Sequence, residues 1–285
     1  MHRFILIIAL LSSGYSHSIH ASELRISAEE LNQNLSNDDI IILDVRDKND
    51  YDVEHIDNAI SFPAELTYDD KTVNGKIQQP QLMQKYLRER GIDTRSKVVI
   101  YDIDHVIDAS RVFWALEVYG ITHLRVLDKG FNYWKDKEYP VSQSVPSIQP
   151  GNYISTINHK RLASKFATQL SINHKNKLII DARSRPAYLG EVSVAKRFGH
   201  IPSAISVPFT ENLIQENGFT GLKSIDELRE LYASVPKDKK IIIYCKIGRV
   251  STANYFALRE LGYDVTNYDA SWREWGNDES LPIEK

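Results

Sequence analysis

An internal repeat restricts the fold of this chain more than any other feature of its sequence. An apolar run containing Asp and ending in Arg precedes a His-Ile pair and a hydrophobic residue before Pro, and this order occurs twice, about 140 residues apart. The first copy comprises Ile41-Ile42-Leu43-Asp44-Val45-Arg46, His55-Ile56 and Phe62-Pro63, and the second comprises Ile179-Ile180-Asp181-Ala182-Arg183, His200-Ile201 and Val207-Pro208. A period this long exceeds any solenoid repeat, so it predicts two domains of one fold.

The correspondence continues through the rest of each half. Residues 98–102 match 241–245, residues 118–120 match 260–262, and residues 127–134 match 268–275. The spacing differs most between Arg183 and His200, which predicts an inserted loop near the functional site. The single cysteine of the chain, Cys245, therefore has Asp102 as its counterpart.

Each half alternates short apolar runs with helical segments, for example residues 80–91 and 224–234. This alternation predicts an α/β fold with two tandem domains, each a mainly parallel central sheet flanked by helices. The expected boundaries are a domain at residues 24–140, a linker rich in Ser, Pro, Gln and Asn at 141–158, and a second domain at 159–285.

The first residues predict export. A basic start is followed by an apolar stretch and by Ala21 at a plausible cleavage site, which is typical of a signal peptide at residues 1–21; an uncleaved anchor is the alternative. We expect a periplasmic or secreted protein without stable membrane association after cleavage, and a monomer. The net charge of -3 gives no reason to expect nucleic acid as a partner.

Cys245 lies where a strand ends and a helix follows. Residues 241–244 are typical of a buried strand, Gly248 indicates a tight loop, and residues 252–261 are typical of a helix. Backbone N–H groups in such a loop create an anion site, which favours a reactive thiolate. The alternative is a buried and inert thiol. A lone cysteine excludes both an internal disulfide and a Cys-x-x-Cys redox pair.

Four motifs in this order resemble the two-domain rhodanese family, the thiosulfate and 3-mercaptopyruvate sulfurtransferases, in its exported bacterial type. The motifs are residues 181–183, residues 198–204, the Cys245 loop and residues 268–275. The resemblance implies a catalytically inactive N-terminal domain, with Asp102 in the cysteine's place, and a catalytic C-terminal domain. It also implies that Cys245 takes a sulfur atom from a small donor as a persulfide and passes it to a thiophilic acceptor such as cyanide or a thiol.

The expected substrate-binding residues surround this cysteine. They are the loop Lys246, Ile247, Gly248, Arg249, Val250 and Ser251, together with Arg185 and Arg197. Lys246 and Arg249 are assigned to an anionic donor, whereas Asp181, Arg183 and His200 are assigned to structure. Scattered histidines predict no metal, and the absence of Gly-rich phosphate motifs predicts no cofactor.

The loop also separates the alternative functions. Lys246 and Gly248 match the loops of the thiosulfate kind within the family that the chain resembles, so the resemblance implies thiosulfate as the donor, with 3-mercaptopyruvate as the alternative. A phosphatase of related fold requires Arg six positions after the cysteine, where this chain has Ser251. A non-catalytic carrier of sulfane sulfur remains compatible with the motifs.

Overall fold

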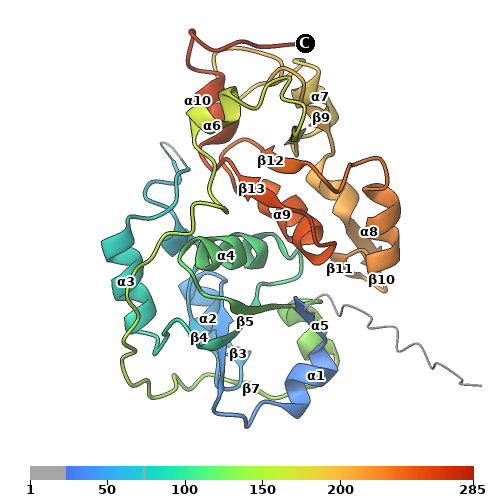
Figure 1. Ribbon diagram of the computed structural model, residues 1–285. Helices are drawn as coiled ribbons and strands as arrows, with labels where there is room; N and C mark the ends of the chain where they lie inside the picture. Colours follow the sequence, from blue (N-terminus) through green and yellow to red (C-terminus); the bar gives the residue numbers. More distant parts are fainter. Residues whose placement is uncertain (1–23, 73–74) are drawn as a thin grey trace, which may run out of the picture.

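The computed structural model of the chain describes residues 24–72 and 75–285, so the signal peptide predicted for residues 1–21 lies outside the described residues. Two parallel sheets, one in each half, form the centre of the fold (Figure 1). The first sheet has the strand order β1 (Arg25–Ile26), β6 (His123–Leu127), β5 (Lys97–Tyr101), β2 (Ile40–Asp44) and β4 (Ile60–Ser61).

Helices cover both faces of this sheet because its central strands are apolar on both sides. In β5, Val98 and Ile100 belong to one buried cluster, whereas Val99 and Tyr101 belong to another. The surrounding elements are α1 (Ala28–Gln33), α2 (Lys48–Val53), the short 3-10 helix η1 (Ala64–Thr67), α3 (Pro80–Arg88), α4 (Ile107–Val118), α5 (Phe131–Asp136), and the antiparallel pair β3 (His55–Ile56) and β7 (Val141–Ser142).

The C-terminal sheet repeats the plan with one strand fewer. Its order is β13 (Val265–Asn267), β12 (Lys240–Tyr244), β8 (Lys177–Asp181) and β9 (Ile205–Ser206), all parallel. The other elements of this domain are α6 (Lys165–Gln169), α7 (Arg185–Tyr188), η2 (Phe209–Asn212), the hairpin β10 (Leu213–Glu216) and β11 (Phe219–Leu222), α8 (Ile225–Leu231), α9 (Ser251–Glu260) and α10 (Ser271–Trp275). The α/β fold class predicted from the sequence is confirmed.

The strand order creates a crevice at a defined place. From β8 the chain moves to β9 on one side, and it later returns to β12 on the other side. Reversals of this kind leave an opening at the carboxyl ends of the two adjacent strands, where parallel sheets bind ligands. Cys245 directly follows β12 and therefore lies at this opening.

The two domains share one hydrophobic core. Helices α4 and α9 lie side by side between the sheets (Figure 1), and the rings of Phe113 and Phe256 meet edge to face with centroids 4.9 Å apart. Nearly every residue of both helices is buried, which is characteristic of helices enclosed on all sides. Residues 143–164 join the domains without a helix or strand. No helix among the described residues is long and apolar enough to cross a bilayer.

A buried ion pair fixes the end of the first central strand in each domain. In the C-terminal domain Asp181 pairs with Arg183 at 2.6 Å, and the hydroxyl of Tyr244 donates to Asp181 at 2.6 Å. Asp44, Arg46 and Tyr101 form the same cluster with the same two distances in the N-terminal domain. These residues hold the strand ends, which is the structural role that the sequence predicted for Asp181 and Arg183.

Candidate active site

Residues of the β13–α10 segment fix the backbone of Cys245 on both sides. Its N–H donates to Ser271 Oγ at 3.0 Å, and its carbonyl accepts from the Trp272 N–H at 3.0 Å. The residue is only 1% exposed, so a donor must enter a confined space to reach it. A closed position of this kind excludes water from a reacting thiolate.

The loop that follows presents unpaired N–H groups. Gly248 has a φ of +69°, and a Cβ atom there would lie 2.4 Å from the Asp269 carbonyl oxygen, so only glycine fits. Its carbonyl accepts from Arg111 Nη1 at 3.1 Å and from Asn267 Nδ2 at 3.3 Å. Within the described part of the chain, the N–H groups of residues 246–251 donate to no protein group. They are available to an anion.

The corresponding loop of the N-terminal domain binds an acidic side chain through its backbone N–H groups. The Asp102 carboxylate, at the cysteine's place, accepts from the N–H groups of Val106 at 3.2 Å, Asp108 at 3.1 Å and Ala109 at 3.2 Å. Burial nevertheless raises the pKa of Asp102 to about 6, and the charge of Asp108 acts in the same direction. A loop in this position can therefore bind a carboxylate through backbone N–H groups. In the N-terminal domain that carboxylate is the side chain of Asp102.

Lys246 and Arg185 are basic residues near the site that form no ion pair with a described residue. Lys246 is exposed and lies at the carboxyl ends of β8 and β12. A small pocket of ≈ 120 Å³ opens beside it, and its other lining residues are Arg183, Ser184, Ala187, Val192, Ser193 and Val194. Arg185 is exposed at the start of α7, where it faces the Tyr188 ring and makes no ion pair with any described residue. The predicted inserted loop thus supplies one wall of the pocket.

Arg249 has a partner that the sequence did not suggest. Its guanidinium forms two hydrogen bonds with the Asp108 carboxylate, at 2.7 and 2.6 Å, across the domain boundary. These hydrogen bonds raise the pKa of Arg249 above its ordinary value, so its charge is fixed. We therefore reassign Arg249 from donor binding to holding the Cys245 loop against α4.

Arg197 is also occupied elsewhere. Its guanidinium donates to the carbonyl oxygens of Leu281 at 2.8 Å and Trp275 at 2.9 Å, and to those of Gly276 and Asp278. The N–H groups of the Arg197 guanidinium thus bind the C-terminal segment. We therefore assign Arg197 to holding that segment in place rather than to donor binding.

The remaining loop residues differ in what they touch. Ser251 is buried and donates from Oγ to Asn267 Oδ1 at 2.8 Å, whereas Ile247 lies against Gly75 of the N-terminal domain. Val250 begins the turn into α9 in helical conformation. These contacts position the loop and leave substrate contact to its N–H groups.

The N-terminal domain contributes residues that the sequence analysis missed. Arg111 lies fully buried in α4, stacked between the rings of Tyr68 at 4.1 Å and Trp114 at 4.5 Å. Arg111 is the one basic residue of α4, whose central residues are otherwise mostly apolar, and this was a sequence signal for it. No local pattern indicated Tyr68, Asp108 or Ser271.

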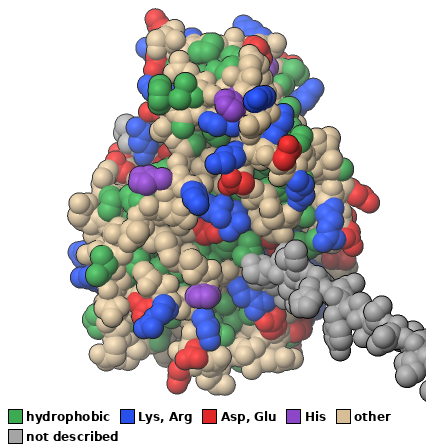
Figure 2. Space-filling view, viewed as in Figure 1, with side chains coloured by type: hydrophobic (Ala, Val, Ile, Leu, Met, Phe, Trp, Pro, Cys, Tyr) green, Lys and Arg blue, Asp and Glu red, His purple; other side chains and the backbone are tan. Residues whose placement is uncertain are grey.

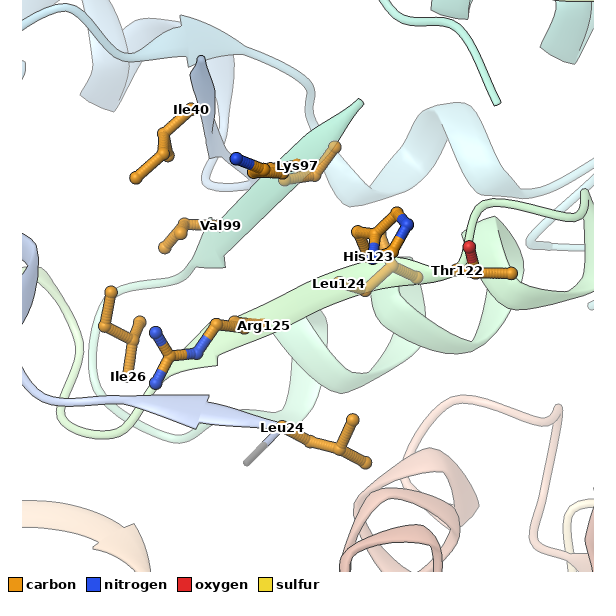
Figure 3. A pocket seen from close by; sticks show the side chains of 10 residues that line it. Leu24, Ile26, Ile40, Lys97, Val99, Thr122, His123, Leu124 and Arg125 are labelled. Atoms are coloured by element: carbon orange, nitrogen blue, oxygen red, sulfur yellow. The ribbon is translucent and has the colours of Figure 1, made fainter. Parts of the chain in front are cut away.

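Two larger pockets lie at the opposite edges of the sheets. One, of ≈ 310 Å³, opens at the amino ends of β2, β5 and β6, with Ile40, Lys97 and His123 around it (Figure 3). Another, of ≈ 600 Å³, includes Lys177 and Lys240 at the amino ends of β8 and β12. Neither reaches the carboxyl ends where Cys245 lies. Basic and acidic side chains are interspersed over the face in Figure 2, so the charge on this face does not gather into one sign.

Some parallel α/β domains carry a cysteine at the start of a loop whose backbone N–H groups are unpaired. This arrangement is typical of proteins in which the cysteine attacks an anionic substrate. The family model of the Rhodanese-like domain matches residues 27–137 and 165–278, and the chain belongs to that family. A protein of Haloferax volcanii named "Putative thiosulfate sulfurtransferase" is 32% identical over 95% of this chain and 99% of its own length. The sulfur carrier protein TtuD of Thermus thermophilus is 30% identical, with the same coverage.

Solved structures agree on the fold. The 3-mercaptopyruvate sulfotransferase SseA of Escherichia coli superimposes with a TM-score of 0.77 at 26% identity, covering 88% of this chain and 99% of that one. A complex of EanB with ergothioneine gives a TM-score of 0.81 at 22% identity, covering 92% of this chain and 70% of that one, which speaks for the fold alone. The names of these relatives make sulfur transfer the activity of the family to which this chain belongs.

Proposed function

We propose that this protein is a sulfurtransferase that takes the outer sulfur of thiosulfate on Cys245 and delivers it to a thiophilic acceptor. One observation carries the proposal: Cys245 begins a loop of unpaired N–H groups at the crevice between β8 and β12, with free Lys246 beside it. The reaction needs a nucleophile, an anion cradle and a cation in one place.

Two displacements complete the reaction. The Cys245 thiolate attacks the outer sulfur, and the bond from that sulfur to the sulfite group breaks with its electron pair remaining on sulfite. The enzyme then holds a persulfide anion, which cyanide attacks at the outer sulfur to release thiocyanate and restore the thiolate. Atoms and charge balance in each step, and the N–H groups of the loop stabilise the anion in both states of the enzyme.

Thiosulfate is favoured over 3-mercaptopyruvate by the loop itself. Lys246 and the unpaired N–H groups suit a compact dianion such as thiosulfate. The name of the Haloferax volcanii relative supports the same donor. The likeness to SseA keeps 3-mercaptopyruvate as the second donor to test.

A carrier that stores sulfur without turnover is the second candidate function. The likeness to the carrier TtuD and the burial of Cys245, at 1% exposure, favour it. A carrier and an enzyme share the loading step and differ in how fast the acceptor removes the sulfur. Multiple turnovers with thiosulfate and cyanide support the enzyme, whereas a single stoichiometric release supports the carrier.

The loading step is tested by intact mass after incubation with thiosulfate. We expect a gain of about one sulfur atom in the wild-type protein and none in Cys245→Ser, because the hydroxyl is not a sulfur nucleophile under these conditions. Asp102→Ala serves as the matched control, since it alters the corresponding loop of the other domain. A wild-type protein that gains no mass from thiosulfate or any other sulfane donor contradicts the proposal.

We also propose that the N-terminal domain is catalytically inactive and that the protein acts as a monomer outside the cytoplasm. The residue at the cysteine's place, Asp102, supports the first point, since a carboxylate cannot form a persulfide.

The basic and apolar start of the sequence supports export. Sequencing the amino terminus of the mature protein and measuring its mass in solution test these proposals.

A further inference from the structure

One buried hydroxyl next to the active loop has no partner. Tyr68 is 4% exposed, and its hydroxyl oxygen is buried without a hydrogen bond to any described residue. Hydroxyls of other buried tyrosines are satisfied: Tyr153, in the segment that joins the domains, donates to the Tyr119 carbonyl at 2.6 Å, and Tyr101 donates to Asp44 at 2.6 Å. A buried polar group without a partner is costly, which indicates a partner absent from the free protein.

Arg111 connects Tyr68 to the Cys245 loop. Its ring stacks on the Arg111 guanidinium at 4.1 Å, and Arg111 in turn donates to the Gly248 carbonyl of the loop at 3.1 Å. Tyr68 also pairs with Ile77 in an antiparallel bridge. The Ile77 N–H donates to Asp269 Oδ2 of the C-terminal domain at 2.6 Å. Because the Asp269 backbone packs against Gly248, both Arg111 and Ile77 connect Tyr68 to groups that contact the loop.

The Tyr68 hydroxyl is held in its protonated form. Burial raises its pKa to about 12; Arg111 and Arg249 act against this, whereas Asp108 and Cys245 act with it. The hydroxyl therefore keeps its proton at neutral pH and is a donor. In the free protein it makes no hydrogen bond with Cys245 Sγ or with any other atom of the described residues.

We infer that the Tyr68 hydroxyl donates a hydrogen bond to the outer sulfur of the Cys245 persulfide. The outer sulfur lies about 2 Å beyond Sγ, the length of an S–S bond, and it carries the negative charge after sulfite leaves. The loaded enzyme thus acquires an atom that the free enzyme lacks, and the unpaired hydroxyl gains a charged partner. A hydrogen bond that exists only in the persulfide form stabilises that form relative to the unloaded enzyme. It therefore raises the equilibrium constant for transfer of sulfur to Cys245.

This inference rests on the proposed function, because it concerns the persulfide of that reaction. The bond changes are those of the loading step: the thiolate forms an S–S bond, sulfite leaves with the electron pair, and the Tyr68 proton stays on its oxygen. The N-terminal domain then contributes a substrate-contacting residue to a site whose nucleophile belongs to the other domain.

The test compares the wild-type protein with Tyr68→Phe at fixed ratios of thiosulfate to sulfite, with the loaded fraction measured by intact mass. Loss of a hydrogen bond to a charged sulfur is expected to lower the loading equilibrium constant about 10-fold or more. Because the hydroxyl has no partner in the free protein, the melting temperature of the unloaded Tyr68→Phe protein should not fall.

Tyr153→Phe is the matched control with the opposite pattern. It removes a hydroxyl that has a protein partner, so the melting temperature should fall while the loading constant stays at the wild-type value. Equal loading of Tyr68→Phe and wild type overturns the inference and leaves the proposed function intact. A Tyr68→Phe protein that is markedly destabilised or fails to fold also overturns it, because the hydroxyl would then have a structural partner. A wild-type protein that does not load contradicts the proposed function itself.

Discussion

At the scale of single residues, the two domains place a carboxyl group and a thiol at the same position. The Asp102 carboxylate accepts hydrogen bonds from the N–H groups of its loop, whereas the N–H groups that follow Cys245 donate to no described protein group. The sequence predicted both positions because strand, loop and helix patterns are local. It could not predict the partners of Arg249 and Arg197, since Asp108 and the C-terminal carbonyls lie far away along the chain.

The Asp102 carboxyl should make stability depend on pH. Its pKa, raised to about 6 by burial, exceeds the ordinary value of 3.8, so its stabilising contribution is complete below pH 3.8 and is lost as the pH rises through 6. Asp102→Asn lacks this titration. Relative to the wild-type protein, its free energy of unfolding should therefore gain about 3 kcal/mol between pH 3.5 and pH 7.5. Urea unfolding across this range measures the difference, and parallel pH profiles would contradict the assignment.

At the scale of elements, contacts between distant segments position the active loop. The loop between β12 and α9 is anchored by α10 through Ser271, by α4 through Arg111, and by the start of α4 through Asp108. The sequence pattern placed the strand and the helix on either side of Cys245, because apolar periodicity is a local property. It missed these anchors, because each depends on how one domain packs on the other.

The pair of Arg249 and Asp108 should act on stability more than on donor binding. The two side chains are 36% and 31% exposed, so the coupling energy between Arg249→Gln and Asp108→Asn in a double-mutant cycle is expected to be about 1 kcal/mol. Neither change should alter the KM for thiosulfate as strongly as Lys246→Gln, for which a rise of about tenfold is expected. Lys240→Gln, at the other end of β12, is the control for the loss of one lysine.

Arg249 would be a donor-binding residue if Arg249→Gln raised the KM for thiosulfate strongly and the coupling energy with Asp108 were zero. The comparison distinguishes a residue that holds the loop from one that contacts the substrate, since only the second kind should change KM without changing the free energy of unfolding.

At the scale of the whole molecule, the two domains cannot be treated as independent units. Buried residues of both domains belong to one cluster, in which Phe113 of α4 contacts Phe256 of α9. The duplication in the sequence indicated two domains of one fold. It did not indicate that the domains share one core. Apolar residues that pack against the other domain follow the same sequence pattern as those that pack within their own domain.

The shared core leads to a prediction about unfolding. Phe256 is fully buried, so Phe256→Ala should lower the free energy of unfolding by roughly 3–5 kcal/mol through lost burial and the cavity that remains. Because the cluster spans both domains, the variant should still unfold in one transition, with circular dichroism and tryptophan fluorescence changing together. Two separate transitions would mean that the domains fold independently. A single transition would mean that the N-terminal domain also stabilises the loop around Cys245, which Arg111 and Asp108 of that domain contact.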